Sequence, residues 1–195
     1  MPSPHSEGFA PEPIKLVVSG GFGVGKTTFV GAISEIAPLT TEAAMTEVAQ
    51  GVDDRSYVTN KTSTTVAMDF GRISVADSLV LYLFGTPGQD RFSFMWDDLV
   101  VGALGAVILV DTRRIEDCFG ALDYFEQRRV PFVVAVNEFD GILRHTPAEV
   151  RDALDLSPDV PVVTCDARTK ESVKGAVLKV LETALAHAES ALAGA

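Results

Sequence analysis

The chain has 195 residues, of which 47% are hydrophobic, enough to bury one sizeable core and too few for two. Its formal net charge of −11 opposes electrostatic binding to nucleic acid or to an anionic membrane surface. The sequence has two cysteines, no apolar run near the roughly 18 to 20 residues of a membrane span, and no secretory signal before its first apolar run. We therefore expect a cytoplasmic protein without nucleic-acid partners and without direct membrane insertion, which reaches a membrane only through a partner.

The amino-terminal part predicts a strand, a loop and a helix after a disordered lead-in. Residues 1–13 carry four prolines and are excluded from the folded domain, which we assign to residues 14–195. Residues 14–19 are a short apolar run that ends in glycines, and residues 29–36 have helical spacing. Residues 40–65 are polar without firm periodicity, which predicts a long mobile connection with a partial helix.

The remaining apolar segments alternate between strand and helix patterns. Strands are predicted at 66–75, 79–84, 103–111, 130–137 and 161–164, and helices at 115–127, 146–154 and 169–191. Such alternation predicts an α/β fold with a mostly parallel six-stranded sheet and helices on both faces. Ligands of this fold class bind at the carboxyl ends of the strands.

A phosphate-binding loop lies between the first predicted strand and helix. Gly20-Gly21-Phe22-Gly23-Val24-Gly25-Lys26-Thr27 fits the pattern G-x-x-x-x-G-K-[ST] in full. The main-chain amides of Gly21, Gly23, Val24 and Gly25 are expected to surround the β-phosphate. Lys26 would bridge the β- and γ-phosphates, Thr27 would bind Mg²⁺, and Thr28 would donate to the α-phosphate. The alternative interpretation is a glycine-rich turn followed by a chance Lys-Thr pair.

The segment Leu83-Phe84-Gly85-Thr86-Pro87-Gly88-Gln89-Asp90 resembles the D-x-x-G-Q element of Ras-like small GTPases. The resemblance implies that Gly88 offers its amide to the γ-phosphate and that Gln89 orients the attacking water as a catalytic residue. Gly85 stands where the superfamily carries an aspartate that holds a Mg²⁺-bound water. An ordinary Pro-Gly turn is the alternative for this stretch.

Thr64-Thr65-Val66-Ala67-Met68-Asp69-Phe70 resembles the end of switch I in the same superfamily. On that alignment Thr65 is the second metal-ligating threonine, next to Thr27. Arg55 and Lys61 precede it on an extended loop, and Arg55 is our candidate for an internal arginine finger that assists catalysis with Lys26 and Gln89. Solvated loop charges are the alternative for both.

Two further segments resemble the base-reading elements of small GTPases. Val136-Asn137-Glu138-Phe139-Asp140 matches the N-K-x-D motif at Asn137 and Asp140, with Glu138 in place of the lysine whose ammonium braces the phosphate loop. The Asp140 carboxylate can accept from guanine N1–H and its amine, whereas adenine presents an acceptor and a C–H there. Thr164-Cys165-Asp166-Ala167-Arg168 stands at the S-A-K element, so Ala167 would donate to guanine O6 and Arg168 would lie against the base.

The order of these elements makes the chain resemble a single P-loop NTPase domain of the Ras-like kind, and most of all the prokaryotic MglA-like group. The segment Arg91-Phe92-Ser93-Phe94-Met95-Trp96-Asp97-Asp98-Leu99 adds a likeness to the conservon-encoded GTPases of actinobacteria. The resemblance implies GTP or GDP with Mg²⁺, a Roadblock-type regulatory protein and a sensor-kinase-like protein as partners. We expect Phe92 and Met95 to pack in the core and Phe94 and Trp96 to be more exposed.

The leading functional hypothesis is a slow GTPase that acts as a nucleotide-dependent switch in a signalling complex. Two alternatives remain at this point. Because of Gly85 and Glu138, the chain could be a guanine-nucleotide-binding scaffold or sensor that hydrolyses little GTP. It could also be a P-loop ATPase.

Overall fold

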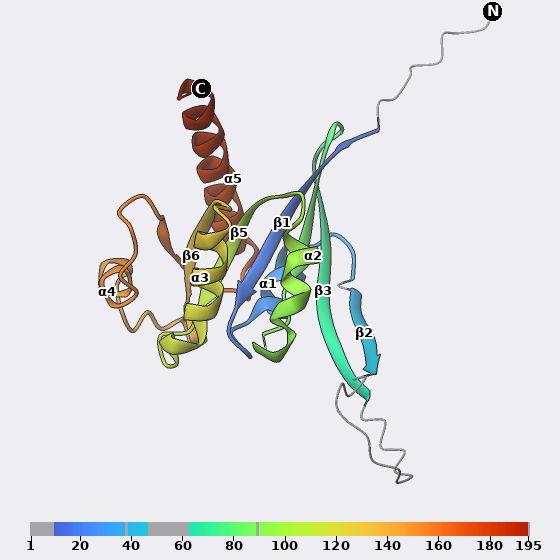
Figure 1. Ribbon diagram of the computed structural model, residues 1–195, viewed down its shortest axis with the longest axis horizontal. Helices are drawn as coiled ribbons and strands as arrows, with labels where there is room; N and C mark the ends of the chain where they lie inside the picture. Colours follow the sequence, from blue (N-terminus) through green and yellow to red (C-terminus); the bar gives the residue numbers. More distant parts are fainter. Residues whose placement is uncertain (1–9, 38, 47–62, 89, 195) are drawn as a thin grey trace, which may run out of the picture.

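A seven-stranded β-sheet runs through the protein in the order β2-β3-β4-β1-β5-β6-β7 (Figure 1). This computed structural model describes residues 10–37, 39–46, 63–88 and 90–194. The strands are β1 Glu12–Gly20, β2 Leu39–Thr46, β3 Ser63–Ala76, β4 Leu79–Gly85, β5 Ala103–Val110, β6 Phe132–Asn137 and β7 Val162–Cys165. Strands β4, β1, β5, β6 and β7 are parallel to one another, whereas β3 pairs antiparallel with both β2 and β4.

Helices cover both faces of this sheet. They are α1 Lys26–Ile33, α2 Trp96–Val100, α3 Phe119–Gln127, α4 Pro147–Ala153 and α5 Lys170–Ala193, with the short 3-10 helices η1 Asp90–Met95, η2 Ile115–Cys118 and η3 Phe139–Gly141. Helices α1 and α5 pack on one face, and α2, α3 and α4 pack on the other (Figure 1). The predicted α/β class, with a mostly parallel sheet between helical layers, is confirmed.

The sheet has seven strands where the sequence predicted six, because residues 40–65 are not simply a polar connection. Leu39–Thr46 forms β2 and pairs with β3 from Leu39 opposite Phe70 to Thr46 opposite Ser63. Pairing with the long strand β3 satisfies the main-chain hydrogen-bonding groups of this polar segment. The composition of the segment alone did not indicate a strand. Residues 47–62 lie outside the described residues, as do residues 1–9 of the expected lead-in. Glu12 and Pro13 of that lead-in belong to β1.

Two hydrophobic clusters, one on each face, fix the central strands. Every residue of β6 is buried, and β5 is buried from Gly105 onward, as expected for strands covered by helices on both sides. One cluster joins Phe29 of α1 and Val177 of α5 to the sheet. The other joins Leu122 of α3 and Val150 of α4 to the opposite face. Because the central strands are rigidly packed, the loops at their carboxyl ends have a firm base.

The single tryptophan differs from its predicted exposure. Phe92 is buried and Phe94 is 56% exposed, as expected, but Met95 is only half-buried and Trp96 is only 5% exposed. The Trp96 indole packs edge-on against Tyr124, with ring centroids 5.2 Å apart, and its Nε1 donates to the carbonyl of Pro87 at 3.3 Å. The apolar spacing of this segment fits a helix that buries Trp96 equally well, so sequence spacing could not separate the two arrangements.

The carboxyl-terminal end of helix α5 is exposed. Its last buried residue is Ala184, and residues 185–193 are all exposed, with Leu185 and Leu192 among them. Figure 1 shows this end of α5 extending beyond the sheet. No helix among the described residues combines the length and apolar character needed to cross a membrane.

Candidate nucleotide-binding site

The phosphate loop leaves the central strand β1 at Gly20 and enters α1 at Lys26. Gly20, Gly23 and Gly25 have φ values of +132°, +72° and +107°, a region that favours glycine. A Cβ on Gly20 would lie 2.3 Å from the carbonyl oxygen of Leu109, so the loop also needs glycine for close packing on β5. The loop therefore curls over the end of the sheet, and its glycines are required by the backbone conformation.

Lys26 lies within this loop and not in solvent. Its ammonium donates to the carbonyl oxygens of Gly20 at 2.8 Å and Gly21 at 2.7 Å, and the residue is only 8% exposed. Burial lowers the pKa of Lys26 to about 8, an effect that the nearby Asp69 carboxylate partly opposes. A buried cation inside a curled glycine loop is an arrangement that can bind an anion.

Thr27 contacts a carboxylate that the sequence did not assign to the site. Its Oγ1 donates to Oδ2 of Asp69 at 2.8 Å, and Asp69 is 7% exposed on β3. Asp69 pairs with Gly85 across β3 and β4, and a Cβ on Gly85 would lie 2.9 Å from the Cβ of Asp69. The Asp69 side chain thus fills the space above Gly85, where Ras-like proteins have their aspartate. The available signal was an acidic residue in an otherwise apolar strand segment, Met68-Asp69-Phe70.

The loop after β4 lies against the phosphate loop. The Thr86 amide donates to the carbonyl of Val18 at 2.9 Å, and its hydroxyl is 3.0 Å from that of Ser19. A Cβ on Gly88 would lie only 2.5 Å from Nζ of Lys26. The structure therefore brings the predicted Gly88 and Lys26 together. Gln89, the predicted catalytic residue of this loop, lies outside the described residues.

Thr65, the predicted metal ligand of switch I, is not brought to the phosphate loop in this structure. Thr65 lies in β3 opposite Ala44, four positions before Asp69. At roughly 3.3 Å per strand residue, its main chain is about 13 Å from that of Asp69 along the strand, so it is not gathered beside Thr27. Arg55 and Lys61 belong to the stretch outside the described residues.

Asn137 joins the phosphate loop to the base-reading loops. It ends β6, is 8% exposed, and donates through Nδ2 to the carbonyl of Val24 at 2.8 Å. Its Oδ1 accepts from the Ala167 amide at 3.1 Å. The Ala167 amide, predicted to donate to a base, is therefore engaged by Asn137, which fixes the loop after β7 directly beside the phosphate loop.

A concave pocket opens between these loops. Its walls come from the phosphate loop, from α1 and from the loops after β6 and β7, and its lining residues are Gly25, Thr28, Asn137, Glu138, Phe139, Asp140, Asp166, Ala167 and Arg168. Asp140 has a φ of +59° and a strongly exposed side chain at the mouth. The structure thus brings the predicted Thr28, Asp140 and Arg168 to one pocket.

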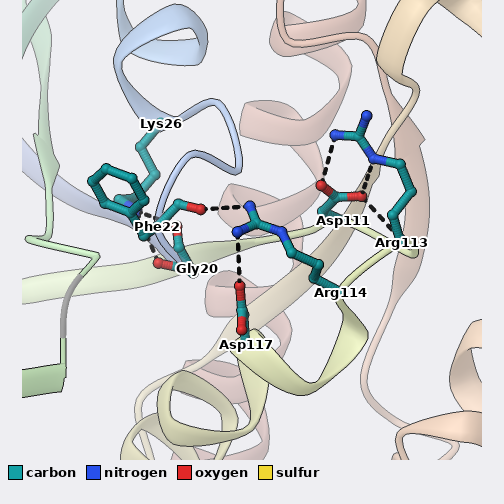
Figure 2. Close-up of polar contacts among 8 residues, drawn as sticks. Gly20, Phe22, Lys26, Asp111, Arg113, Arg114 and Asp117 are labelled. Carbon is teal, nitrogen blue, oxygen red and sulfur yellow. Dashed lines mark hydrogen bonds and ion pairs between the residues drawn. The ribbon is translucent and has the colours of Figure 1, made fainter.

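Two arginines around this pocket are held by neighbouring carboxylates. Arg168 forms a bidentate pair with Asp166, with both distances 2.9 Å, which lowers the pKa of Asp166, and its Nη1 is 3.9 Å from Asp140. Arg113 forms a bidentate pair with Asp111 (Figure 2). Its guanidinium lies 3.9 Å from the centre of the Phe139 ring. The sequence did not assign the Asp111–Arg113 pair, because bidentate pairing two residues apart has no spacing signature.

Together, the curled glycine loop on the central strand and the pocket beside it at the carboxyl edge define a P-loop nucleotide-binding protein with the Ras-like arrangement. Residues 18–187 match the family described as "conserved hypothetical ATP binding protein", and the chain belongs to this family.

Two relatives and one solved structure resemble this chain over most of its length. The chain is 29% identical over 132 residues to an uncharacterized protein of Methanocaldococcus jannaschii, a match that covers 65% of this chain and 71% of that protein. It is 25% identical over 190 residues to the human Ras-related protein Rab-7b, which covers 92% of this chain and 86% of the relative. The G domain of the T. maritima FeoB iron transporter has the same fold, with a TM-score of 0.60, 19% identity, and coverage of 89% of this chain and 99% of that chain.

Proposed function

We propose that the protein binds GTP and GDP with Mg²⁺ and hydrolyses GTP slowly as a nucleotide-dependent switch. The observation that carries this proposal is the Asn137 amide, which bonds both the phosphate-loop carbonyl of Val24 and the amide of Ala167. A single side chain thereby holds a phosphate loop and a base pocket at one fixed spacing, which is what a nucleoside polyphosphate requires. The likeness to Rab-7b, a Ras-related protein, supports the same class.

The choice of guanine rests on the mouth of the pocket. Asp140 presents a carboxylate that accepts hydrogen bonds only, and guanine offers two donors on the edge that would face it. A site built around such a pair can reject a base lacking the donors by about 10⁴ to 10⁵. The family description names ATP, but adenine presents an acceptor and a C–H on this edge and would leave Asp140 without those donors, so the Asp140 carboxylate favours guanine over adenine.

Thr27 and Asp69 fit a Mg²⁺ ion, because a hydroxyl and a carboxylate oxygen, the ligand types that Mg²⁺ prefers, lie 2.8 Å apart beside the phosphate loop. With nucleotide bound, the ion would neutralise charge on the β- and γ-phosphate oxygens. Lys26 would hold the same phosphates, and the Gly88 amide would meet the γ-phosphate. Gln89 would orient the water whose oxygen attacks the γ-phosphorus as GDP leaves.

Thr65 and Arg55 keep a conditional role in this proposal. Thr65 would reach the metal only if the end of β3 rearranges when a γ-phosphate is present, and Arg55 would supply positive charge from the adjoining stretch. By resemblance to MglA-like and conservon-encoded GTPases, we propose a Roadblock-type regulator and a sensor-kinase-like protein as partners in a cytoplasmic complex, with any membrane association through them.

The decisive experiment compares GDP, ADP and xanthosine diphosphate on the intact chain and on Asp140→Asn by calorimetry. We expect GDP to bind the intact chain by far the most tightly, and the substitution to shift preference toward the xanthine nucleotide, whose extra carbonyl pairs with the new amide. An intact chain that prefers ADP would refute the guanine proposal and support the family's ATP description.

Hydrolysis needs a separate measurement, because a scaffold with little turnover would bind the same nucleotides. Single-turnover GTP hydrolysis by the intact chain, with and without a Roadblock-type protein, distinguishes the two. We expect slow release of phosphate that falls further in Gln89→Leu. Phosphate release at the rate of GTP in buffer, under both conditions, would leave a nucleotide-binding scaffold as the better description.

A further inference from the structure

We propose that Arg114 is a positioning residue that braces the phosphate loop from outside, in place of the lysine that Glu138 replaces. The proposal rests on the function proposed above and identifies how this chain keeps its phosphate loop in order. Figure 2 shows the Arg114 guanidinium between the carbonyl oxygen of Phe22 and the carboxylate of Asp117. Its Nη2 donates to the Phe22 oxygen at 2.7 Å, and its Nη1 lies 3.5 Å from Oδ2 of Asp117.

The segment that carries Arg114 is itself fixed against the loop. The Arg114 amide donates to the carbonyl of Asp111 at 2.9 Å, and the Asp117 amide donates to the carbonyl of Arg114 at 3.2 Å at the start of η2. A Cβ on Gly21 would lie 2.5 Å from the Cβ of Asp117, so η2 packs directly on the phosphate loop. The guanidinium therefore reaches Phe22 from a close and anchored position.

The geometry of one peptide unit explains how this contact acts on the anion site. In a planar trans peptide the C=O and N–H point in opposite directions. A guanidinium that holds the Phe22 carbonyl on the outside of the loop thereby keeps the Gly23 N–H pointing to the inside, where the phosphate would bind. Donation to the carbonyl also polarises the peptide and strengthens its N–H as a donor.

A lysine at position 138 is the residue expected to brace the loop in Ras-like proteins, but Glu138 carries no donor and opposite charge. Among the described side chains, Arg114 is the cation that donates to a carbonyl of the 22–24 turn. Asn137 bonds the next carbonyl but one, that of Val24, from the base side. The turn is thus held from two sides, by a neutral amide and by a guanidinium.

The test uses the full chain with Arg114→Gln, Arg114→Lys and a matched control, Arg151→Gln. Arg151 is also an arginine that donates to main-chain carbonyls, those of Ser157 and Val160, but it lies in α4, outside the phosphate loop and the base pocket. Two quantities are measured: the dissociation rate and affinity of fluorescently labelled GDP, and hydrogen exchange of the peptide that covers residues 20–28 without nucleotide.

We expect Arg114→Gln to weaken GDP binding about tenfold, through faster dissociation, because a charge-assisted hydrogen bond is lost. Exchange at 20–28 should accelerate while exchange in β5 and β6 stays the same, which a general loss of stability would not produce. Arg114→Lys should recover part of the affinity, and Arg151→Gln should match the unsubstituted chain in both measurements.

Unchanged GDP affinity together with unchanged exchange at 20–28 in Arg114→Gln would overturn the proposal while leaving the proposed function intact. If the unsubstituted chain binds no GDP, the proposed function fails, and hydrogen exchange alone then decides whether Arg114 braces the loop.

Discussion

The hydroxyl of Thr27 and the carboxylate of Asp69 are joined by a hydrogen bond of 2.8 Å, although the two residues come from a helix start and from a neighbouring strand. Across the sheet, Asp69 faces Gly85, and its side chain fills the space that a side chain there would need. The acidic group expected after β4 is therefore supplied from β3. This relationship can be tested by moving the carboxylate from position 69 on β3 to position 85 on β4.

Asp69→Ala should remove most of the Mg²⁺ dependence of GDP binding, with a loss of roughly tenfold to a hundredfold in affinity when Mg²⁺ is present. Adding Gly85→Asp to that variant should restore part of the dependence, because the space vacated by Asp69 then receives the new carboxylate. The measurement is GDP titration with Mg²⁺ and with EDTA. Asp77→Ala, on the β3–β4 turn, serves as the control, and full Mg²⁺ dependence in Asp69→Ala would contradict the metal assignment.

We expect GDP binding to be linked to protonation of Lys26. Its pKa is lowered to about 8 by burial, and adjacent phosphates would favour the charged ammonium and raise that pKa. Above pH 8, GDP binding should therefore take up a proton, and affinity should fall with rising pH by up to about tenfold per unit. Calorimetry at pH 8.5 in two buffers of different ionisation enthalpy measures this uptake, which should vanish in Lys26→Met.

The lowered pKa of Lys26 has the opposite effect on the stability of the nucleotide-free chain, which should rise with pH where GDP affinity falls. Between pH 8 and about 10.5 the unfolded lysine binds a proton that the folded one does not, so the contribution of Lys26 to the free energy of unfolding rises across this window. Urea denaturation of the intact chain and of Lys26→Met at pH 7.5 and pH 9.5 checks this, and an equal pH response in both would exclude it.

Asn137→Ala should destabilise the nucleotide-free protein by about 2 kcal/mol, because it leaves the Val24 carbonyl and the Ala167 amide without their partner in a buried position. Urea denaturation followed by far-ultraviolet circular dichroism measures the change. Thr146→Ala, which removes an exposed helix cap of α4, offers a comparison with an expected cost of roughly 1 kcal/mol. A smaller loss of unfolding free energy in Asn137→Ala than in Thr146→Ala would mean that the phosphate loop and the loop after β7 do not depend on the Asn137 side chain.

Trp96 provides an intrinsic signal for the loop after β4. It is the single tryptophan, and its indole bonds the carbonyl of Pro87 while packing on Tyr124. Any rearrangement of Pro87 and Gly88 on binding a γ-phosphate should change its fluorescence emission. We expect spectra of the free, GDP-bound and GTP-analogue-bound chain to differ, and identical spectra in all three states would place this loop outside the nucleotide response.

The part of the fold that the sequence could predict is the part governed by local patterns. The phosphate loop is an unbroken motif, and β5 and β6 are unbroken apolar runs, so their positions follow from neighbouring residues. Asp69 belongs to the site because β3 and β4 pair in one register, a long-range fact that no local pattern contains. The same reason explains β2, which becomes a strand by pairing with β3 and not by its own composition.

Arg114 and Asp111 illustrate a second limit of prediction. Both lie just after β5, a strand that the sequence predicted correctly, yet which loop faces the phosphate loop depends on the neighbour relationship of β1 and β5. The base-reading roles of Asn137 and Ala167 stay predictions, and the structure adds contacts that the motifs do not indicate: Asn137 bonds the Val24 carbonyl and the Ala167 amide. Spacing identified these positions, and the packing of the sheet determined their partners.

The projecting end of α5 offers a practical opportunity. The helix begins at Lys170, directly after the base pocket, and its 24 residues span roughly 36 Å. Because residues 185–193 are all exposed, their helicity depends more on the intrinsic preference of alanine and leucine than on packing against the domain. A dye or surface linker attached there would sit far from the base pocket, and trimming this end should leave the melting temperature of the domain nearly unaltered.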